Sequence, residues 1–311
     1  VRKAEETPLF ATGADTMSGF VPQISLLAAF VLMLLSIAVL VYFLNHIPAS
    51  IRVNAVLEGI GARLLRDIKR IFPDENRGER SANRPTGTPI IAKETGYIQS
   101  IQFEALERLA RTENGKLNLA VRTGDFVHPS VALAYWADRD AIDDCPDDKV
   151  RACFGTGAMR TPAQDMQFLI DELVEIGLRA LSPGINDPFT AVTAVHWLGA
   201  ATAELARRNL TRSFAEEGEE PHLVPLDDDF EHYLARGFGA MRSGVATNRI
   251  ATLVMFDALV DATTTLDDET RRAAIRREGE RLVRQAREHL VGPELLAVEA
   301  RFQIFRNAVQ R

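Results

Sequence analysis

Residues Ile24–Leu44 read ISLLAAFVLMLLSIAVLVYFL and include no charged side chain. A helix needs about 20 consecutive apolar residues to cross the hydrocarbon core of a bilayer, and this run has that length. A buried core helix usually has a shorter apolar run, and a secretory signal has a short one that ends in small residues before its cleavage site. The run therefore predicts a transmembrane helix over residues 21–46.

The charges on the two sides of this helix differ, and the difference predicts its orientation. Arg52, Arg63 and Arg66 follow the helix closely, whereas residues 5–21 contain no Lys or Arg. Because Lys and Arg are enriched on the cytoplasmic side of membrane spans, the C-terminal side is expected to be cytoplasmic and residues 1–20 an extracytoplasmic loop. The two cysteines, Cys145 and Cys153, are then expected to be thiols with a structural or incidental role.

The length that follows the helix, about 265 residues, is enough for one large or two modest domains, and we expect two. The net charge is −7, and arginines are not clustered into a basic face, so nucleic acid is not an expected partner. The chain begins with Val1 instead of Met, which suggests a fragment that other transmembrane helices could precede.

Directly after the span, residues 47–72 have apolar side chains at helical spacing, and Pro48 stands where a new helical turn could start. This predicts an amphipathic connecting helix. It could lie along the membrane surface, couple the span to the next domain, or simply pack on its own protein. Residues 73–88 are rich in Pro, Gly, Asn and charged residues, as is typical of an exposed linker.

Residues 89–137 contain short runs of strand-forming residues separated by turns, with one short helix at 103–111, and predict a small β-barrel or sandwich-like module. The run Gly124–Val127 followed by Leu133 resembles the hairpin of biotinyl or lipoyl-like domains in shape. No lysine stands at a hairpin tip to carry a cofactor, so none is expected. Residues 138–160 are acidic, but their spacing departs from a calcium-binding loop, and a solvated loop without metal is predicted.

Residues 161–311 are predicted to be helical throughout. Thr161 with Pro162 and Gln164 forms a helix-start signal, and the helix is expected to end at Ser182-Pro183-Gly184. Asp187-Pro188 restarts the chain as a second helix by the same capping logic. Short connections between these and the later helices imply a mostly antiparallel bundle. The fold class is therefore a membrane-anchored α+β protein, in which the span is the C-terminal transmembrane helix of a larger bundle.

The turn between the first two of these helices gathers polar groups, and it is the strongest candidate binding site. Free N–H groups of the second helix point into the same space, and they could hold an anion or a polar headgroup. Asp187 would occupy those donors, however, and the same residues are what a tight interhelical turn requires. The candidate ligand-binding residues are Gln164, Asp165, Arg179, Ser182, Asn186, Asp187, Thr190, Asn248 and Arg249.

The string Leu178–Ala191, LRALSPGINDPFTA, together with Asp165-Met-Gln167-Phe168, resembles the bacterial predicted membrane proteins grouped as domain of unknown function 2254. The pieces Phe20-Val21-Pro22, Gly96-Tyr97-Ile98 and Gly124–Val127 fit the same family, so the resemblance covers nearly the whole chain. It implies a bacterial inner-membrane protein with cytoplasmic C-terminal domains and further upstream helices. The family has no established activity, so the resemblance implies architecture alone.

Motifs for nucleotide binding, serine hydrolysis and zinc proteolysis are absent, so no catalytic residues are assigned and an enzyme is not favoured. Three functions remain open. The first is a membrane protein with a cytoplasmic domain for ligand binding, sensing or assembly, whose partners would be the lipid bilayer, a small polar ligand and a second copy of the chain. The second is a subunit of a channel or transporter, and the third is a membrane-bound enzyme that uses the Ser-Pro-Gly-Ile-Asn-Asp-Pro turn.

Overall fold

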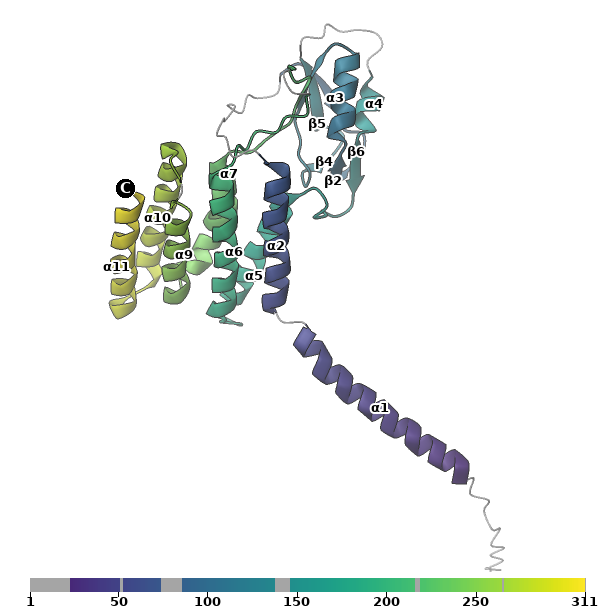
Figure 1. Cartoon of the computed structure of the whole chain (residues 1–311), viewed down its shortest axis with the longest axis vertical. Coiled ribbons are helices and arrows are strands. Elements are labelled where there is room, and N and C mark those ends of the chain that lie inside the picture. Colours follow the sequence, from purple (N-terminus) through teal and green to yellow (C-terminus); the bar gives the residue numbers. More distant parts are fainter. Residues whose placement is uncertain are drawn as a thin grey trace, which may run out of the picture. The chain divides into compact units, whose positions relative to one another are not determined.

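A computed structural model describes residues 23–50, 53–73, 86–137, 146–215, 219–264 and 266–310. The chain divides into two compact units, Val1–Arg52 and Val53–Arg311. The second unit contains strands and helices, so the mixed α+β class predicted from the sequence is confirmed (Figure 1). The acidic residues 138–145, including Cys145, lie outside the described residues, as do the extracytoplasmic loop and most of the linker.

The described part of the first unit is one helix, α1 (Gln23–Ser50). Its segment Ile24–Phe43 is long and apolar enough to cross a membrane, and all of the side chains in that segment are exposed. This agrees with the predicted apolar helix. The expectation that Pro48 starts a new helix is wrong, because α1 continues to Ser50 and the φ angle of proline is compatible with a helix. The expectation that α1 closes a larger bundle has no support in the described residues.

The amphipathic segment after the span forms α2 (Val53–Ile71), whose apolar face packs on α5 (Met166–Ala180) and α6 (Pro188–Ala206). Gly61 allows close contact, because a Cβ atom there would lie 2.2 Å from the ring of Trp197. The helix buries Leu57, Leu64 and Ile68 in this way. It is therefore an integral part of the helical region and not a separate connector.

The β module consists of two small sheets and is not a closed barrel. The strands of the first sheet are ordered β1-β5-β3-β7 and those of the second β4-β2-β6. Each sheet keeps two edges, so the barrel alternative is wrong. Strands β3 and β5, which flank the turn region around Gly124, pair antiparallel with each other, whereas β4 between them pairs with β2. The bounds are β1 (Thr88–Ile91), β2 (Gly96–Ile101), α3 (Phe103–Thr112), β3 (Lys116–Leu119), β4 (Phe126–Val127) and β5 (Ala132–Ala137).

Two segments that the sequence assigned elsewhere complete these sheets. The described part of the expected acidic loop contains α4 (Asp147–Arg151) and β6 (Phe154–Gly157), and β6 pairs with β2. Strand β7 (Leu223–Val224) comes from the region predicted to be all helical and lies parallel to β3. The buried Glu107 holds it in place by accepting hydrogen bonds from the backbone N–H groups of His222 and Leu223.

The remaining chain is helical, with one interruption that the sequence did not predict. The helix expected over 228–245 is α7 (Phe230–Leu234) and α8 (Ala240–Val245), joined by a π-helical segment, Ala235–Gly239. Two glycines in this segment weaken the α-helical preference. The helices α9 (Arg249–Asp261), α10 (Glu269–His289) and α11 (Gly292–Val309) follow, and they share one apolar core with α2, α5, α6 and α8.

Candidate functional site

Helix α5 begins at Met166, five residues after the expected start signal, because the capping residue is Asp165 and not Thr161. One carboxylate oxygen of Asp165 accepts the backbone N–H of Phe168 at 3.0 Å, which satisfies a donor that has no partner inside the helix. Asp165 is nevertheless only 3% exposed, which is unusual for a carboxylate. A buried carboxylate needs a cation, and Arg160 supplies it.

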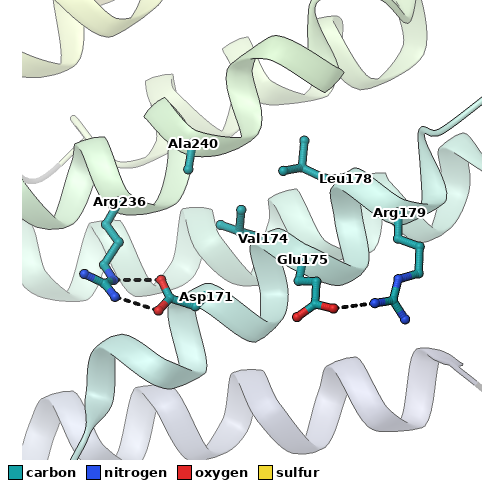
Figure 2. Close-up of a pocket in the computed structure, with 7 residues that line it drawn as sticks. All are labelled: Asp171, Val174, Glu175, Leu178, Arg179, Arg236 and Ala240. Carbon is teal, nitrogen blue, oxygen red and sulfur yellow. Dashed lines mark hydrogen bonds and ion pairs between the residues drawn. The ribbon is translucent and has the colours of Figure 1, made fainter. Parts of the chain in front are cut away.

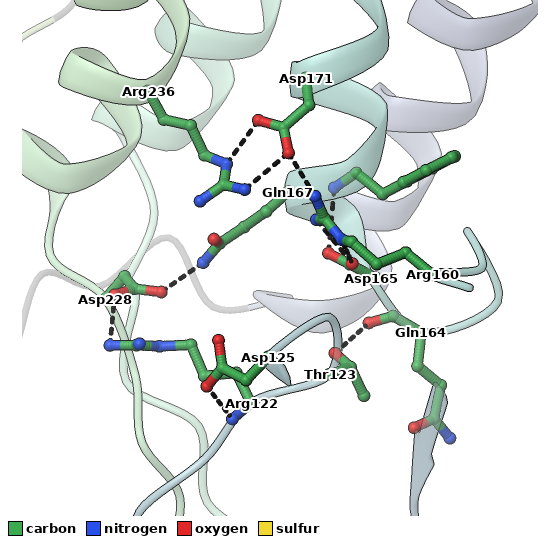
Figure 3. Close-up of polar contacts among 11 residues, drawn as sticks. Arg122, Thr123, Asp125, Arg160, Gln164, Asp165, Gln167, Asp171, Asp228 and Arg236 are labelled. Carbon is green, nitrogen blue, oxygen red and sulfur yellow. Dashed lines mark hydrogen bonds and ion pairs between the residues drawn. The ribbon is translucent and has the colours of Figure 1, made fainter. Parts of the chain in front are cut away.

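Arg160 lies between two carboxylates of α5 (Figure 3). Its Nη2 atom lies 2.7 Å from Asp165, and its Nη1 atom lies 2.5 Å from Asp171, which is on the same helix. Arg236 reaches Asp171 from the π-helical segment, and its Nε and Nη2 atoms lie 2.7 Å and 2.6 Å from the two carboxylate oxygens. We call these four residues, Arg160, Asp165, Asp171 and Arg236, the α5 network. Its two positive and two negative charges balance.

The β module packs directly on this network through the turn at residues 122–125. Gly124 has a φ of +92°, and a Cβ atom there would lie 2.1 Å from an Asp165 carboxylate oxygen. The hydroxyl of Thr123 donates to the backbone oxygen of Gln164 at 3.0 Å, and the side-chain oxygen of Gln164 accepts the N–H of Ile101 at 2.9 Å. Gln164 and Asp165 therefore join the β module to the start of α5.

A second group of charges lies beside the first, at a small polar cavity of about 40 Å³ that Gln164 and Asp165 also line. The Nη2 atom of Arg122 lies 2.6 Å from Asp228, and the side chain of Gln167 donates to the same carboxylate (Figure 3). Burial raises the pKa of Asp228, although Arg122 opposes this shift. A polar cavity of this size can hold a water molecule but not a metabolite.

A larger groove of about 670 Å³ lies between α5 and the segment that carries Arg236 (Figure 2). Its floor is apolar, and its charged side chains are already in two pairs, Asp171 with Arg236 and Glu175 with Arg179. Asp171 and Arg236 belong to both the groove and the α5 network. The groove is lined by Asp171, Val174, Glu175, Leu178, Arg179, Arg236 and Ala240.

At the other end of α5 lies the turn that was the strongest candidate site in the sequence. Its polar groups form hydrogen bonds with neighbouring residues of the same turn. Asp187 caps α6 by accepting the N–H and the hydroxyl of Thr190 at 3.2 Å and 2.6 Å, and Thr190 thereby lowers the pKa of this carboxyl. The hydroxyl of Ser182 donates to the carbonyl of Arg179 at 2.7 Å, and Asn186 adopts a φ of +48°. The donors that an anion would need are therefore occupied by Asp187.

The candidate residues do not form one site. Gln164 and Asp165 lie at the start of the 15-residue helix α5, whereas Ser182 lies just beyond its end, about 22 Å away along the helix axis. Asn248 caps α9 by accepting the N–H of Ala251 at 3.1 Å, and Arg249 is exposed. The α8–α9 junction does lie near the turn, since Gly244 packs against Leu178 and Leu181.

Asp165 and Asp187 are also the carboxylates that an enzyme would use, and their pKa values shift in opposite directions. Burial raises the pKa of Asp165, with Arg160 opposing, while the hydrogen bonds of Thr190 lower that of Asp187. The oxygens of Asp165 are bound by Arg160 and Phe168, so neither is free to act as a base. The raised pKa therefore reflects the burial of a carboxylate whose oxygens are already engaged in structural contacts.

The sequence did not predict the residues that complete the polar clusters. Arg236 and Asp171 are 65 positions apart, and Arg122 and Asp228 come from the β module and the start of α7. No local pattern connects such positions. One available signal was the pair Gly237 and Gly239 inside a predicted helix, because two glycines within three residues disfavour an α-helix.

The apolar helix and the mixed α+β unit define a predicted membrane protein, and the comparisons agree. Residues 7–261 match the family described as "Predicted membrane protein (DUF2254)", and the chain belongs to that family, as the resemblance implied.

Relatives come from mycobacteria and are described as uncharacterized. The chain is 28% identical over 278 residues to the uncharacterized protein Mb1321c of Mycobacterium bovis and to the uncharacterized protein Rv1290c of Mycobacterium tuberculosis. The matches cover 86% of this chain and 53% of each relative, so the chain spans about half the length of these relatives. No solved structure matches the chain.

Proposed function

We propose that this chain is an inner-membrane protein whose second unit, Val53–Arg311, is a cytoplasmic sensory module that binds a small polar ligand in the groove beside α5. One observation carries the proposal, namely that Arg236 and Asp171 line the groove and also belong to the α5 network. A ligand that takes up Arg236 would withdraw one of the two cations on Asp171. The strengths of the two ion pairs that Arg160 forms, with Asp171 and with Asp165, would then change relative to each other.

The consequence of such a shift would reach the β module. Asp165 is in contact with Gly124, and its neighbour Gln164 binds both Thr123 and Ile101. A change at the groove is therefore linked to the β module through the ion pairs of the α5 network, the packing of Asp165 on Gly124, and the hydrogen bonds of the adjoining Gln164. The π-helical segment supports this role, because π-helical turns are frequent at functional sites and offer an alternative register.

The ligand chemistry follows from the groove lining. Val174, Leu178 and Ala240 supply an apolar surface, while Arg179 and Arg236 can each exchange an internal carboxylate for one on the ligand. We expect a small molecule with a carboxylate or phosphate and an apolar part. Because Glu175 and Arg179 are both largely exposed, that pair should open at little cost.

The test uses thermal unfolding of the purified chain in detergent, with citrate, inorganic phosphate and AMP as probes. At least one probe should raise the melting temperature of the wild type. Ala240→Trp, which fills the groove, and Arg236→Gln should remove the effect. Ala200→Trp on α6 is the matched control, since Ala200 is also exposed but lies outside the groove lining. Equal stabilisation of Ala240→Trp and wild type by a probe would contradict the proposal.

The cytoplasmic location rests on the arginines that follow the apolar helix and has its own test. A green fluorescent protein fused to the C-terminus should fluoresce, and an alkaline phosphatase fusion at the same position should be inactive. The opposite pair of results would place the second unit outside the cytoplasm.

A further inference from the structure

Large apolar side chains are exposed unevenly on the second unit. Outside α1, ten large hydrophobic residues are exposed among the described residues, and seven of them lie in or beside the helix-connecting turns at one end of the helical region. Phe189 is 69% exposed and Val291 78% exposed. Isolated exposed apolar residues are ordinary, but their concentration at one end indicates an interaction surface. The seven are Val53, Val56, Ile185, Phe189, Ile250, Val291 and Leu296.

Helices α2 and α6 begin at this end because they run parallel. Gly61 of α2 lies against Trp197 of α6, and eleven residues further along both helices Arg208 donates to the carbonyl of Phe72 at 2.6 Å. The same offset at two levels is possible only for parallel helices. The first turns of α2 and α6 therefore lie at the same end of the second unit (Figure 1).

The other turns reach the same end by alternation of the later helices. Gly244 at the end of α8 packs against Leu181 at the end of α5, so α9 starts beside the α5–α6 turn. Helix α10 starts at the opposite end, where Arg271 donates to the carbonyl of Ala206 at 2.8 Å. It runs back, so the α10–α11 turn with Val291 lies at the first end again. We call this surface the α2 end.

The chain itself limits how far the α2 end can lie from the membrane. Only Ile51 and Arg52 separate Ser50, the last residue of α1, from Val53, so three Cα–Cα steps of 3.8 Å hold these two residues within about 11 Å. The apolar segment ends at Phe43, and the seven helical residues after it extend about 10 Å, which is comparable to the thickness of a headgroup layer. The α2 end is thus tethered within reach of the lipid surface.

The chemistry of the α2 end also suits a membrane interface. Its apolar side chains come from the start of α2 and from three connections between later helices, and the ring of Phe189 can fit among headgroups and upper acyl chains. Arg249 is exposed next to Ile250, and a long basic side chain can keep its charge among phosphates while its neighbour is in hydrocarbon. At the other end of the unit, by contrast, the β module exposes only Phe126 and Met159 among its described large apolar residues.

We propose that the α2 end of the second unit lies on the lipid surface, with Ile185, Phe189 and Val291 inserted at the headgroup level. The contact goes beyond anchoring by α1, because it fixes the orientation of the second unit on the membrane. The string Ser-Pro-Gly-Ile-Asn-Asp-Pro-Phe then has a role as a membrane-contacting turn. It presents Ile185 and Phe189 on a rigid frame made by its polar groups.

Nitroxide labels on the full chain in nanodiscs of phosphatidylcholine and phosphatidylglycerol test this. In a background of Cys145→Ala and Cys153→Ala, single variants Ile185→Cys, Phe189→Cys and Val291→Cys are labelled. Collisions with oxygen, which concentrates in lipid, should exceed those with a water-soluble nickel chelate several-fold at these three positions. Met159→Cys, which is 73% exposed in the β module, is the matched control and should show the reverse ratio.

Two results would overturn the inference. If the three labels collide with the nickel chelate as freely as the Met159→Cys label, the α2 end faces water. If they are shielded from both reagents and show dipolar broadening between labels, the α2 end contacts a second copy of the chain and not lipid. The four labelled side chains are exposed, so labelling at these positions should not prevent folding. Neither result depends on whether the groove beside α5 binds a ligand.

Discussion

The two ends of α5 carry similar polar residues but use them in opposite ways. Asp165 before α5 and Asp187 before α6 each accept the N–H three residues further on, which is the same capping geometry. Asp165 is buried and also bound by Arg160, whereas Asp187 lies at the surface and has both of its partner atoms on Thr190. The comparison shows that a capping motif alone does not tell a structural turn from the centre of a polar network.

The first and largest expected effect comes from removing the buried carboxylate. Asp165→Ala removes the cap of α5 and leaves Arg160, which is only 20% exposed, with one carboxylate instead of two. Breaking a buried pair of this kind should cost about 3 kcal/mol in the free energy of unfolding. Denaturant titration of the purified chain measures it. Asp165→Asn keeps a capping oxygen and should cost clearly less, and an equal loss in both variants would contradict this account.

The second largest loss of stability is expected from disturbing the contact between the β module and the start of α5. Gly124→Ala introduces a Cβ atom that clashes with Asp165, and it places alanine at an unfavourable φ of +92°. The clash and the backbone strain together should lower the free energy of unfolding by about 2 kcal/mol. Gly184→Ala, in the turn at the other end of α5, is the matched control. A Cβ atom there meets nothing within 4 Å, so the melting temperature should hardly change. If Gly124→Ala left the stability unchanged, the turn at residues 122–125 would not be in tight contact with the α5 network.

Removing Asp187, the cap of α6, should reduce the stability less than the two changes above. Asp187→Ala removes one acceptor for the first turn of α6 and one for the hydroxyl of Thr190, and a half-buried cap of this kind contributes about 1 kcal/mol. Asp187→Asn should retain most of the stability, because its amide oxygen can still accept. A loss for Asp187→Ala as large as that for Asp165→Ala would remove the contrast between the two ends.

The same contrast explains what the sequence could predict. Apolar periodicity and capping residues are local, so the apolar helix, the restart at Asp187 and the strand-forming runs at β2, β3 and β5 were predicted close to their observed places, whereas β4 was not. Strand β7 was missed, because a two-residue strand has no periodicity of its own and depends on Glu107 and β3 to form. Helix α4 and strand β6 were also missed, because they lie within residues 138–160, which were predicted to form an acidic loop.

The candidate site was predicted only in part, for a related reason. Gln164 was part of a helix-start pattern and Asp165 part of the string that resembles the family, and the two residues do join the β module to α5. Their partners Arg160, Asp171 and Arg236 come together only through tertiary packing and a π-helical segment. Polar density along the chain drew attention to the turn at residues 182–190, where neighbouring residues satisfy one another. Burial, which separates these cases, cannot be read from local composition.

The smallest expected effect is a difference in sign between the two carboxylates as the pH is changed. Burial raises the pKa of Asp165 above its ordinary value of 3.8, so between that value and the raised one the folded state binds more protons than the unfolded state. In that pH range, the contribution of Asp165 to the free energy of unfolding therefore falls as the pH rises. The pKa of Asp187 is lowered below 3.8, so its contribution is present above that value and is lost as the pH falls through the lowered pKa.

The measurement compares free energies of unfolding from acidic to neutral pH for the wild type, Asp165→Asn and Asp187→Asn. Subtracting each variant from the wild type isolates one carboxyl from the other acidic groups. The Asp165 difference should decrease with rising pH, because the buried charge becomes harder to hold, while the Asp187 difference should increase, because its charge is what Thr190 binds. Two slopes of the same sign would show that both carboxylates experience the same surroundings, and the contrast between the ends of α5 would not hold.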